Sequence, residues 1–334
     1  MDPYKVLRIS RNPDGSITRD LTFPLSPPSS DAGVLCRDLP LNPARRTTLR
    51  LFLPSPSPPP AYSKLPVIVY FHGGGFILFR SATAPMHALC ARLAAELPAL
   101  VLSVDYRLAP EHRLPAAFED AIDALFWLRA HATGVSTEGN LPLPLADCAD
   151  FSLCFLMGNS AGATIAFHAA VLAAALPEPL DPVNIAGLVL DQPYFGGIER
   201  TESELRLKDD KIIPLPANDL MWELALPEGA DKDHEYSNPL KNEEKLFAGL
   251  RNFPRCLVRG HTGDPLFDRQ REFARMLERR GVHVAASLES DGVHGVELFD
   301  PSREEELVTE VKRFLCGEDG VATASAAVIA LQKL

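Results

Sequence analysis

The sequence predicts an α/β fold in which a mainly parallel, twisted sheet carries helices on both faces. Three observations predict it. Apolar runs of strand length recur along the chain, among them the continuous run 66–71 and the run 151–157, and such runs mark strands buried on both faces of a sheet. Stretches with helical periodicity separate these runs. Strand and helix therefore alternate, which favours parallel strands joined by crossover helices.

The first half of the chain supplies most of the expected elements. Residues 4–22 alternate apolar and polar positions around the turn Asn12-Pro13-Asp14-Gly15, which predicts a small hairpin or N-terminal arm. Proline and serine enrichment, or turn residues, predict loops at 24–33, 55–60 and 134–150. The remaining patterns predict strands at 49–53, 66–71, 99–104 and 151–157 and helices at 84–97, 116–132 and 163–176.

The second half interrupts this alternation once. Residues 196–250 are charged and punctuated by proline, with an apolar patch at 220–224, so they form either a lid over a site or a surface helical insertion with a buried tryptophan. The small-residue tail 321–334 is expected to be poorly ordered, outside a single domain of residues 1–320. The flanking patterns predict strands at 185–191, 255–259 and 282–288 and helices at 266–280 and 302–315, with Gly281 capping the first of these.

Composition excludes several classes of protein. Apolar residues make up 46% of the 334 residues, enough for a large core, and the net charge of −11 disfavours nucleic acid as a partner. The N-terminus lacks a signal-peptide layout and no apolar run reaches membrane-spanning length, so we expect a cytoplasmic protein without a membrane anchor. The six cysteines are scattered and lack a zinc-binding pattern, so we expect reduced thiols and no metal.

One short motif indicates chemistry. Residues 158–162, Gly-Asn-Ser-Ala-Gly, have the spacing G-x-S-x-G between an expected buried strand and an alanine-rich helix. This is the context of a nucleophile elbow, in which a strained turn lifts the serine oxygen out of the sheet. Glycines at 158 and 162 remove side chains that would collide where strand and helix meet. The motif predicts Ser160 as a nucleophile.

A nucleophilic serine needs a base and an acid. In proteins with such an elbow the acid follows in the chain and the histidine comes last. Loops after the two later strands carry Asp264 and His294, and both loops belong at the carboxyl edge of the sheet, where the elbow also lies. Asp264 also fits as a helix N-cap before Pro265. The competing acids and base are Asp268, Asp291 and His261.

The glycine run that follows the strand at 66–71 predicts an oxyanion hole. His72 precedes three glycines, and Gly74 and Gly75 let the backbone approach a substrate closely. Their amides, together with that of Ala161 after the nucleophile, are the expected donors, while His72 is expected to order the loop. The run lacks the lysine of a phosphate loop and the spacing of a dinucleotide fingerprint, so no cofactor is expected.

Four aromatic residues are candidates for an apolar substrate pocket, and each could equally pack in the core. An apolar pocket favours an uncharged acyl or aromatic ester. The candidates are Phe76, Phe79, Tyr194 and Trp222.

These motifs together resemble a known family. The chain is similar to the hormone-sensitive-lipase-like branch of the α/β-hydrolases, and more closely to its plant carboxylesterases, over about residues 4–315. The resemblance implies the triad Ser160, Asp264 and His294, oxyanion donors at Gly74, Gly75 and Ala161, and a cap built from about 1–47 and 196–250. The motifs that carry it are His72-Gly73-Gly74-Gly75, the run 106–112 (Tyr-Arg-Leu-Ala-Pro-Glu-His), the elbow 158–162, the run 264–268 (Asp-Pro-Leu-Phe-Asp), Val293-His294-Gly295 and the N-terminal run 12–19.

The implied function is that of a serine carboxylesterase acting on small, largely uncharged esters through an acyl-enzyme. The gibberellin receptor of the same family keeps the serine and aspartate but lacks the histidine, and it binds hormone without hydrolysis. Other relatives are dehydratases or cyclases, some with threonine in place of the nucleophilic serine. Because this sequence has both Ser160 and His294, it favours the esterase over these two alternatives.

Overall fold

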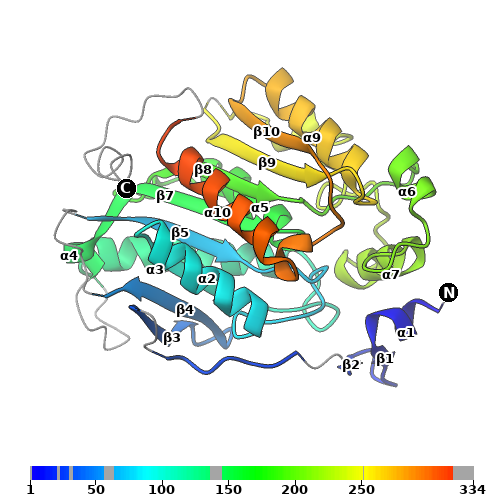
Figure 1. Ribbon diagram of the computed structural model, residues 1–334, viewed down its shortest axis with the longest axis horizontal. Coiled ribbons are helices and arrows are strands. Elements are labelled where there is room, and N and C mark those ends of the chain that lie inside the picture. The colour runs from blue at the N-terminus through cyan, green and yellow to red at the C-terminus, as the bar shows by residue number, and fades with distance from the viewer. Residues whose placement is uncertain are drawn as a thin grey trace.

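An eight-stranded sheet runs through the molecule with helices on both of its faces (Figure 1). The computed structural model describes residues 2–20, 23–29, 33–55, 64–135, 145–250 and 252–318. Along the sheet the strand order is β10-β9-β8-β7-β5-β6-β4-β3. The strands are β3 (Val34–Asn42), β4 (Thr47–Pro54), β5 (Leu65–Phe71), β6 (Leu100–Asp105), β7 (Ala149–Asn159), β8 (Ile185–Asp191), β9 (Arg255–His261) and β10 (Val284–Ser290).

Most neighbouring strands are parallel. Every pairing from β10 through β9, β8, β7 and β5 to β6 is parallel, whereas β4 runs antiparallel to both β6 and β3. The predicted mainly parallel α/β fold is therefore confirmed, with an antiparallel edge added. The carboxyl ends of the parallel strands share one edge of the sheet, which is where polar residues can meet.

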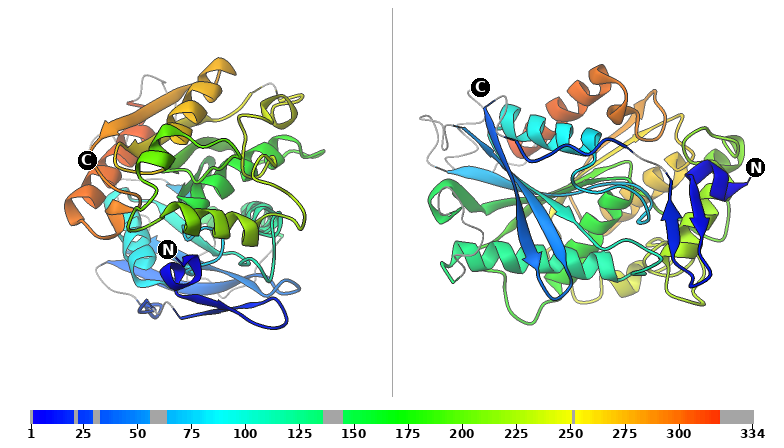
Figure 2. Two further views of the ribbon diagram at one scale, coloured as in Figure 1. Left: turned by 90° about the vertical axis from the view of Figure 1, so that its right-hand side faces the viewer. Right: turned by 90° about the horizontal axis from the view of Figure 1, so that it is seen from below.

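Helices cover the two faces and divide the core in two. Helices α2 (Ala84–Glu96) and α10 (Pro301–Leu315) pack on one face, and α3 (Ala116–Ala132), α5 (Ala161–Ala174) and α9 (Phe267–Arg279) on the other (Figures 1 and 2). Successive residues of β5 alternate between these cores: Val67 and Val69 belong to one, Ile68 and Tyr70 to the other. This alternation explains why the strand is apolar at every position.

The N-terminal arm lies beside the insertion, beyond the carboxyl ends of the strands (Figures 1 and 2). Strands β1 (Ile9–Arg11) and β2 (Ile17–Arg19) form the predicted antiparallel hairpin. Helix α1 (Pro3–Leu7) was not predicted, although its start is marked by Asp2, whose side chain accepts a hydrogen bond from the Tyr4 amide at 3.0 Å, and by proline in its first turn. Helix α1 packs against α7 (Leu215–Ala225).

One arginine fixes the arm to the body of the molecule. The Arg19 guanidinium donates to the carbonyl oxygens of Ile77 at 2.6 Å and Ala109 at 2.8 Å, and it pairs with Glu111 at 2.7 Å. Ile77 lies two residues after the glycine run, so the arm is anchored next to the loop that we expected to form the oxyanion hole.

The insertion at 196–250 contains three short helices: α6 (Glu202–Arg206), α7 and α8 (Glu243–Leu246). Trp222 of α7 is fully buried, as expected for a helical insertion with a buried tryptophan. Helices α6 and α7 lie on the same side of the molecule as α1 (Figure 1). The role of the insertion as a lid stays a prediction.

Strand β3 and helix α4 (Leu145–Cys148), like α1, were missing from the prediction. Strand β3 was not predicted because it is an edge strand with exposed polar positions at Arg37 and Asp38, which weaken its apolar pattern. Helix α4 occupies part of the stretch expected to be a loop. Most of the predicted loop at 55–60, the middle of the loop at 134–150 and the tail 321–334 lie outside the described residues.

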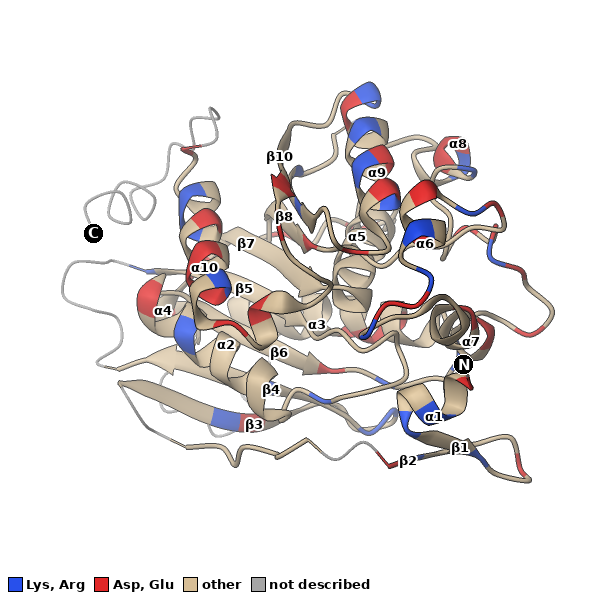
Figure 3. Cartoon of the chain, turned by 45° about the vertical axis from the view of Figure 1, so that its right-hand side comes forward, with Lys and Arg blue, Asp and Glu red and all other residues tan. Residues whose placement is uncertain are grey.

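The charged residues lie mainly on the outer helices. Lys, Arg, Asp and Glu gather along α9, α10 and α6, while the central strands carry few of them (Figure 3). The net negative charge is thus spread over solvated faces. Among the helices in the described ranges, none combines the length and apolar character needed to cross a membrane.

Candidate active site

The turn between β7 and α5 holds Ser160 in a strained conformation. Its φ is 53° and its ψ is −123°, a backbone region that residues other than glycine rarely occupy. A Cβ at Gly158 would lie 2.2 Å from the Gly162 carbonyl carbon, and one at Gly162 would lie 1.9 Å from the Phe71 carbonyl oxygen. Both glycines are therefore required for α5 to begin directly against the end of β5.

We expect Gly162→Ala to destabilise the fold strongly. The added methyl group would overlap the backbone of β5, which cannot move without breaking the sheet, so the cost should exceed about 4 kcal/mol. Urea unfolding followed by circular dichroism would measure it. Gly134→Ala is the matched control: a Cβ there meets nothing within 4 Å, and only its left-handed φ of 70° should cost about 1 kcal/mol. Equal stability of the two variants would contradict the steric argument.

Three side chains from separate loops form a continuous hydrogen-bonded chain at the carboxyl edge of the sheet. His294 Nε2 lies 2.8 Å from Ser160 Oγ, and His294 Nδ1 lies 2.7 Å from Asp264 Oδ2. All three residues are buried, and Asp264 is fully inaccessible. Ser160 follows β7, Asp264 follows β9 and His294 follows β10, which is the order that the sequence predicts.

The contacts settle which nitrogen of His294 carries the proton. An ionised carboxylate only accepts hydrogen bonds, so Nδ1 donates to Asp264 and Nε2 is left to accept the Ser160 hydroxyl proton. Burial works against the charged imidazolium, but the charge and hydrogen bond of Asp264 outweigh burial and raise the pKa of His294 above its ordinary value. The two contacts therefore orient the imidazole with Nε2 toward the Ser160 hydroxyl group.

Asp264 has two further hydrogen-bond donors. The Leu266 amide donates to Oδ1 at 2.8 Å, and Gln270 Nε2 donates to Oδ2 at 2.8 Å. Asp264 is not the helix N-cap that the sequence allowed, because α9 begins at Phe267 with Leu266 as its N-cap, and Asp264 lies in the turn before it. Sequence reasoning missed Gln270, although its place in the first turns of α9, six residues after the acid, puts it on the helix face next to Asp264.

The competing residues lie elsewhere. Asp268 accepts hydrogen bonds from the Ser203 amide at 2.8 Å and from Arg271 at 2.9 Å, so it joins α6 to α9. Asp291 lies 3.4 Å from the Thr262 hydroxyl in an exposed loop. His261 contacts Glu297 at 2.7 Å and does not contact Ser160. The structure brings none of these three into hydrogen-bond contact with Ser160.

The glycine loop lies next to Ser160. Gly73, Gly74 and Gly75 line the same cavity as Ser160, and the latter two have positive φ values of 110° and 60°. A Cβ at Gly75 would lie 2.3 Å from the Met221 sulfur, so the Met221 side chain would have to move, and the positive φ also disfavours residues other than glycine there. Ala161 begins α5, so its amide belongs to the first helical turn, whose N–H groups have no partner within the helix and favour negative charge.

His72 stabilises this loop from behind. Its Nδ1 lies 2.8 Å from the Gly73 carbonyl oxygen, and its ring stacks on Tyr106 with the centroids 4.3 Å apart. The Tyr106 hydroxyl donates to the His72 carbonyl oxygen at 2.8 Å. Burial lowers the pKa of His72, which keeps the ring neutral. These contacts agree with the expectation that His72 orders the loop.

A cavity of about 270 Å³ opens onto Ser160 and His294. Of the four aromatic candidates, Phe79 and Tyr194 line it. Phe76 and Trp222 do not line it, and both are buried. The Trp222 ring stacks on the ring of Tyr194 with the centroids 4.7 Å apart, and the ring centroids of Phe76 and Trp222 are 5.5 Å apart. Those two residues support the wall and do not form its surface. Trp222 lies on a face of α7 that is turned away from the cavity, and Phe76 lies in the loop that follows the glycine run.

Another face of α7 and the N-terminal arm supply lining residues that the sequence did not suggest. Met221 of α7 reaches the cavity beside Trp222, and Val6 and Leu7 reach it from α1. Apolar residues at 6, 7 and 221 looked like ordinary core positions in the sequence. The rest of the lining comprises Phe23, Leu78, Met86, Asn159, Lys211, Ile212, Ile213, Gly295, Leu298 and Phe299.

The comparison with protein families decides the identity. A family model described as an alpha/beta hydrolase fold matches residues 68–298, well over half of the chain, including the glycine loop, the elbow and the histidine loop. The chain belongs to the α/β-hydrolase family. Among solved structures, a hyperthermophilic esterase from the archaeon Pyrobaculum calidifontis superposes with a TM-score of 0.69 at 28% identity, over 86% of this chain and 83% of that one.

Curated relatives place this α/β-hydrolase beside plant carboxylesterases, as the resemblance implied. The Arabidopsis thaliana protein named probable carboxylesterase 8 is 48% identical over 97% of this chain and 97% of its own length. The 3-O-acetylpapaveroxine carboxylesterase CXE1 of Papaver somniferum is 43% identical over 95% and 98%. The gibberellin receptor GID1 of Oryza sativa subsp. japonica is a more distant relative, 34% identical over 77% and 68%.

Proposed function

We propose that this α/β-hydrolase is a serine carboxylesterase that hydrolyses small, largely uncharged esters through an acyl-enzyme on Ser160. The protein is a carboxylic ester hydrolase, in keeping with its nearly full-length similarity to plant carboxylesterases. The observation that carries the proposed mechanism is the hydrogen-bonded chain from Ser160 through His294 to Asp264 at the floor of an apolar cavity.

The proposed reaction assigns each group a step. Ser160 Oγ attacks the ester carbonyl carbon while His294 Nε2 takes its proton, and Asp264 stabilises the imidazolium that results. The amides of Gly74, Gly75 and Ala161 donate to the oxyanion, each contributing about 3 kcal/mol to transition-state stabilisation. His294 returns the proton to the leaving alcohol, and it then activates a water molecule that releases the acid.

The lining of the cavity supports the proposed substrate class. Among the described residues that line the cavity, Lys211 is the one with a permanently charged side chain, and it is exposed. Burying a charge against the remaining apolar walls would be costly, so an uncharged ester fits best. The poppy relative, whose name describes an esterase of an O-acetyl group, is consistent with a short acyl chain.

The proposal includes the surroundings of the site. We propose that the N-terminal arm, about 1–47, and the insertion 196–250 cap the cavity, because Val6, Ile213 and Met221 from these segments line it.

A small ester is the proposed partner, and the cytoplasm is the proposed location. The support for a reducing compartment is that Cys36, Cys90, Cys154 and Cys256 are buried thiols without disulfide bonds.

Hydrolysis in water enriched in the heavy oxygen isotope would test the proposal. The purified protein should hydrolyse a short-chain nitrophenyl ester, and the carboxylic acid product should contain one labelled oxygen from solvent. A receptor would bind the ester without turnover, and a dehydratase or cyclase would release an elimination product without solvent oxygen. Either of those two results would overturn the proposed function.

The pH dependence should report the pairing of His294 with Asp264. As a base His294 must be neutral, so kcat/KM should fall as the pH drops through its raised pKa. In Asp264→Asn the carboxylate that raises this pKa is lost, so the acidic limb should move to lower pH while kcat falls about 10⁴-fold. Asp291→Asn removes an exposed carboxylate from the loop that carries His294 and should leave the profile unchanged. A limb that does not move in Asp264→Asn would show that His294 is not the titrating base.

A further inference from the structure

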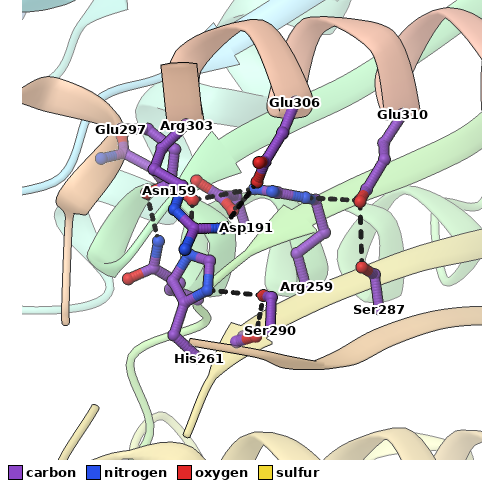
Figure 4. Close-up of polar contacts among 12 residues, drawn as sticks. Asn159, Asp191, Arg259, His261, Ser287, Ser290, Glu297, Arg303, Glu306 and Glu310 are labelled. Atoms are coloured by element: carbon purple, nitrogen blue, oxygen red, sulfur yellow. Dashed lines mark hydrogen bonds and ion pairs between the residues drawn. The ribbon is translucent and has the colours of Figure 1, made fainter. Parts of the chain in front are cut away.

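A buried polar cluster lies behind the loop that carries His294. It joins Asp191 at the end of β8, Arg259 and His261 of β9, and Glu297 three residues after His294 (Figure 4). Glu297 Oε1 accepts from His261 Nε2 at 2.7 Å and from Arg259 at 3.0 Å. Arg259 also pairs with Asp191 at 2.6 Å. Since a buried polar group is costly unless it is satisfied, this cluster allows few alternative arrangements of the loop.

Gln192 connects the cluster to the histidine loop. Its Oε1 accepts from the Gly295 amide at 2.6 Å, and its Nε2 donates to Glu297 Oε2 at 2.5 Å. The Gly295 amide can only donate, so it fixes which end of the Gln192 side chain faces it, and the NH₂ group must then face the carboxylate. The Gln192 side chain thus contacts Gly295, which directly follows His294, and Glu297, which lies three residues after it.

The same segment also fixes the nucleophile. The Ser160 amide donates to the Asp191 carbonyl oxygen at 2.8 Å, and the Gln192 amide donates to the Arg259 carbonyl oxygen at 2.9 Å. Gln192 has a φ of 49°, a left-handed backbone conformation that residues other than glycine or asparagine seldom adopt. Its backbone is thereby fixed against the elbow while its side chain holds the loop of His294.

Glu297 is kept as a permanent acceptor. Burial favours its neutral form, but the hydrogen bond from His261 and the charge of Arg259 outweigh burial and lower the pKa of Glu297. A protonated carboxyl group would instead offer a hydrogen to the donors that surround it. The ionised form satisfies Gln192, His261 and Arg259 at once.

We propose that Gln192 and Glu297 are positioning residues that set the distance between His294 Nε2 and Ser160 Oγ. The pair couples the strand end that holds the nucleophile to the loop that carries the base, so that the two reacting groups move as one unit. This inference rests on the proposed function, in which His294 takes the proton of Ser160.

A reciprocal exchange tests the pair. Gln192→Glu alone places two carboxylates against each other. Glu297→Gln alone replaces one of the two carboxylate oxygens with an NH₂ group. In one orientation this group faces Gln192 Nε2, and in the other it faces the donors of Arg259 and His261, so two donors oppose each other in both. The double variant Gln192→Glu/Glu297→Gln restores an acceptor for Gly295, a donor–acceptor contact between the two side chains and an acceptor for His261, with the net charge unchanged.

We expect each single variant to lower kcat for a short-chain nitrophenyl ester by on the order of 10- to 100-fold, the scale of a small misplacement of reacting groups, with KM nearly unchanged. The double variant should recover most of kcat. Glu310→Gln is the matched control: it makes the same carboxylate-to-amide change at another Arg259 partner, 2.6 Å from Nε, but touches neither Gln192 nor Gly295, and it should retain wild-type kcat.

Several results would overturn the inference: wild-type kcat in the single variants, a double variant no better than the singles, or a loss in Glu310→Gln as large as theirs. Should the single variants fail to fold, Gln192→Met keeps the shape of the side chain without its hydrogen bonds, and an unchanged kcat in that variant would equally refute the proposal. A wild-type protein without ester turnover would instead overturn the proposed function, on which the inference rests.

Discussion

Ser160→Ala should leave a folded protein with almost no esterase activity. Loss of the nucleophile removes the acyl-enzyme route, and in serine hydrolases such a loss lowers kcat about 10⁶-fold. The fold should survive because alanine keeps the Cβ and the backbone of residue 160, while only one hydrogen bond, to His294, is lost. Stability should therefore change by about 1 kcal/mol or less. Steady-state kinetics and urea unfolding measure the two quantities.

The control for this variant is a serine on the same strand. Ser152 lies near the start of β7, exposed, and its hydroxyl contacts Asp150 at 2.5 Å. Ser152→Ala should keep wild-type kcat. An organophosphonate that labels serine nucleophiles should modify the wild-type protein and Ser152→Ala but not Ser160→Ala. Persistent activity or labelling in Ser160→Ala would assign the nucleophile to another residue.

Features with local causes could be predicted from the sequence. The elbow depends on contacts within a few residues of Ser160 and on the end of one neighbouring strand, so the spacing of two glycines predicts it. A strand buried on both faces, such as β5, can be recognised as a continuous apolar run. The contacts of Asp264 and His294 also agree with the prediction, because the order of strands in a parallel sheet fixes which loops meet at its carboxyl edge.

The cavity wall could not be predicted in the same way. Trp222 and Met221 are neighbours on α7, yet one is packed in the layer behind and the other contacts the cavity. Which face of a short helix points inward depends on how α7 packs against α1 and the sheet, and apolar composition is similar on both faces. Tertiary packing therefore determines which residues of an inserted helix line the cavity. Their hydrophobicity indicates only that they are buried.

Gln192 is a third case, because its position in the sequence indicates a site residue although we did not predict it as one. It follows the buried strand β8 directly, at the edge where Ser160, Asp264 and His294 were expected. A polar residue at the carboxyl end of a buried parallel strand is a candidate for the site by the same argument that selected Asp264. Its two partners, Gly295 and Glu297, lie more than 100 residues away in the chain, so its role required the structure.

His294→Ala should have an effect as large as that of Ser160→Ala, for a different reason. The nucleophile remains but has no acceptor for its proton, so kcat should again fall about 10⁶-fold. The lost imidazole faces the cavity, so free imidazole in solution should enter and restore part of the turnover in His294→Ala but none in Ser160→Ala. His112→Ala, an exposed histidine on the loop before α3, should behave as the wild type.

The same variant tests how esterase and receptor differ on this fold. The cavity walls, the glycine loop and Ser160 are unchanged in His294→Ala, so an ester should still bind with an affinity close to that of the wild type while its hydrolysis stops. Isothermal titration with an uncleaved ester analogue and kinetics with the ester would measure the two properties separately. Equal loss of binding and turnover would mean that His294 mainly shapes the cavity. Retained binding without turnover would show that one proton acceptor separates an esterase from a binding protein on this scaffold.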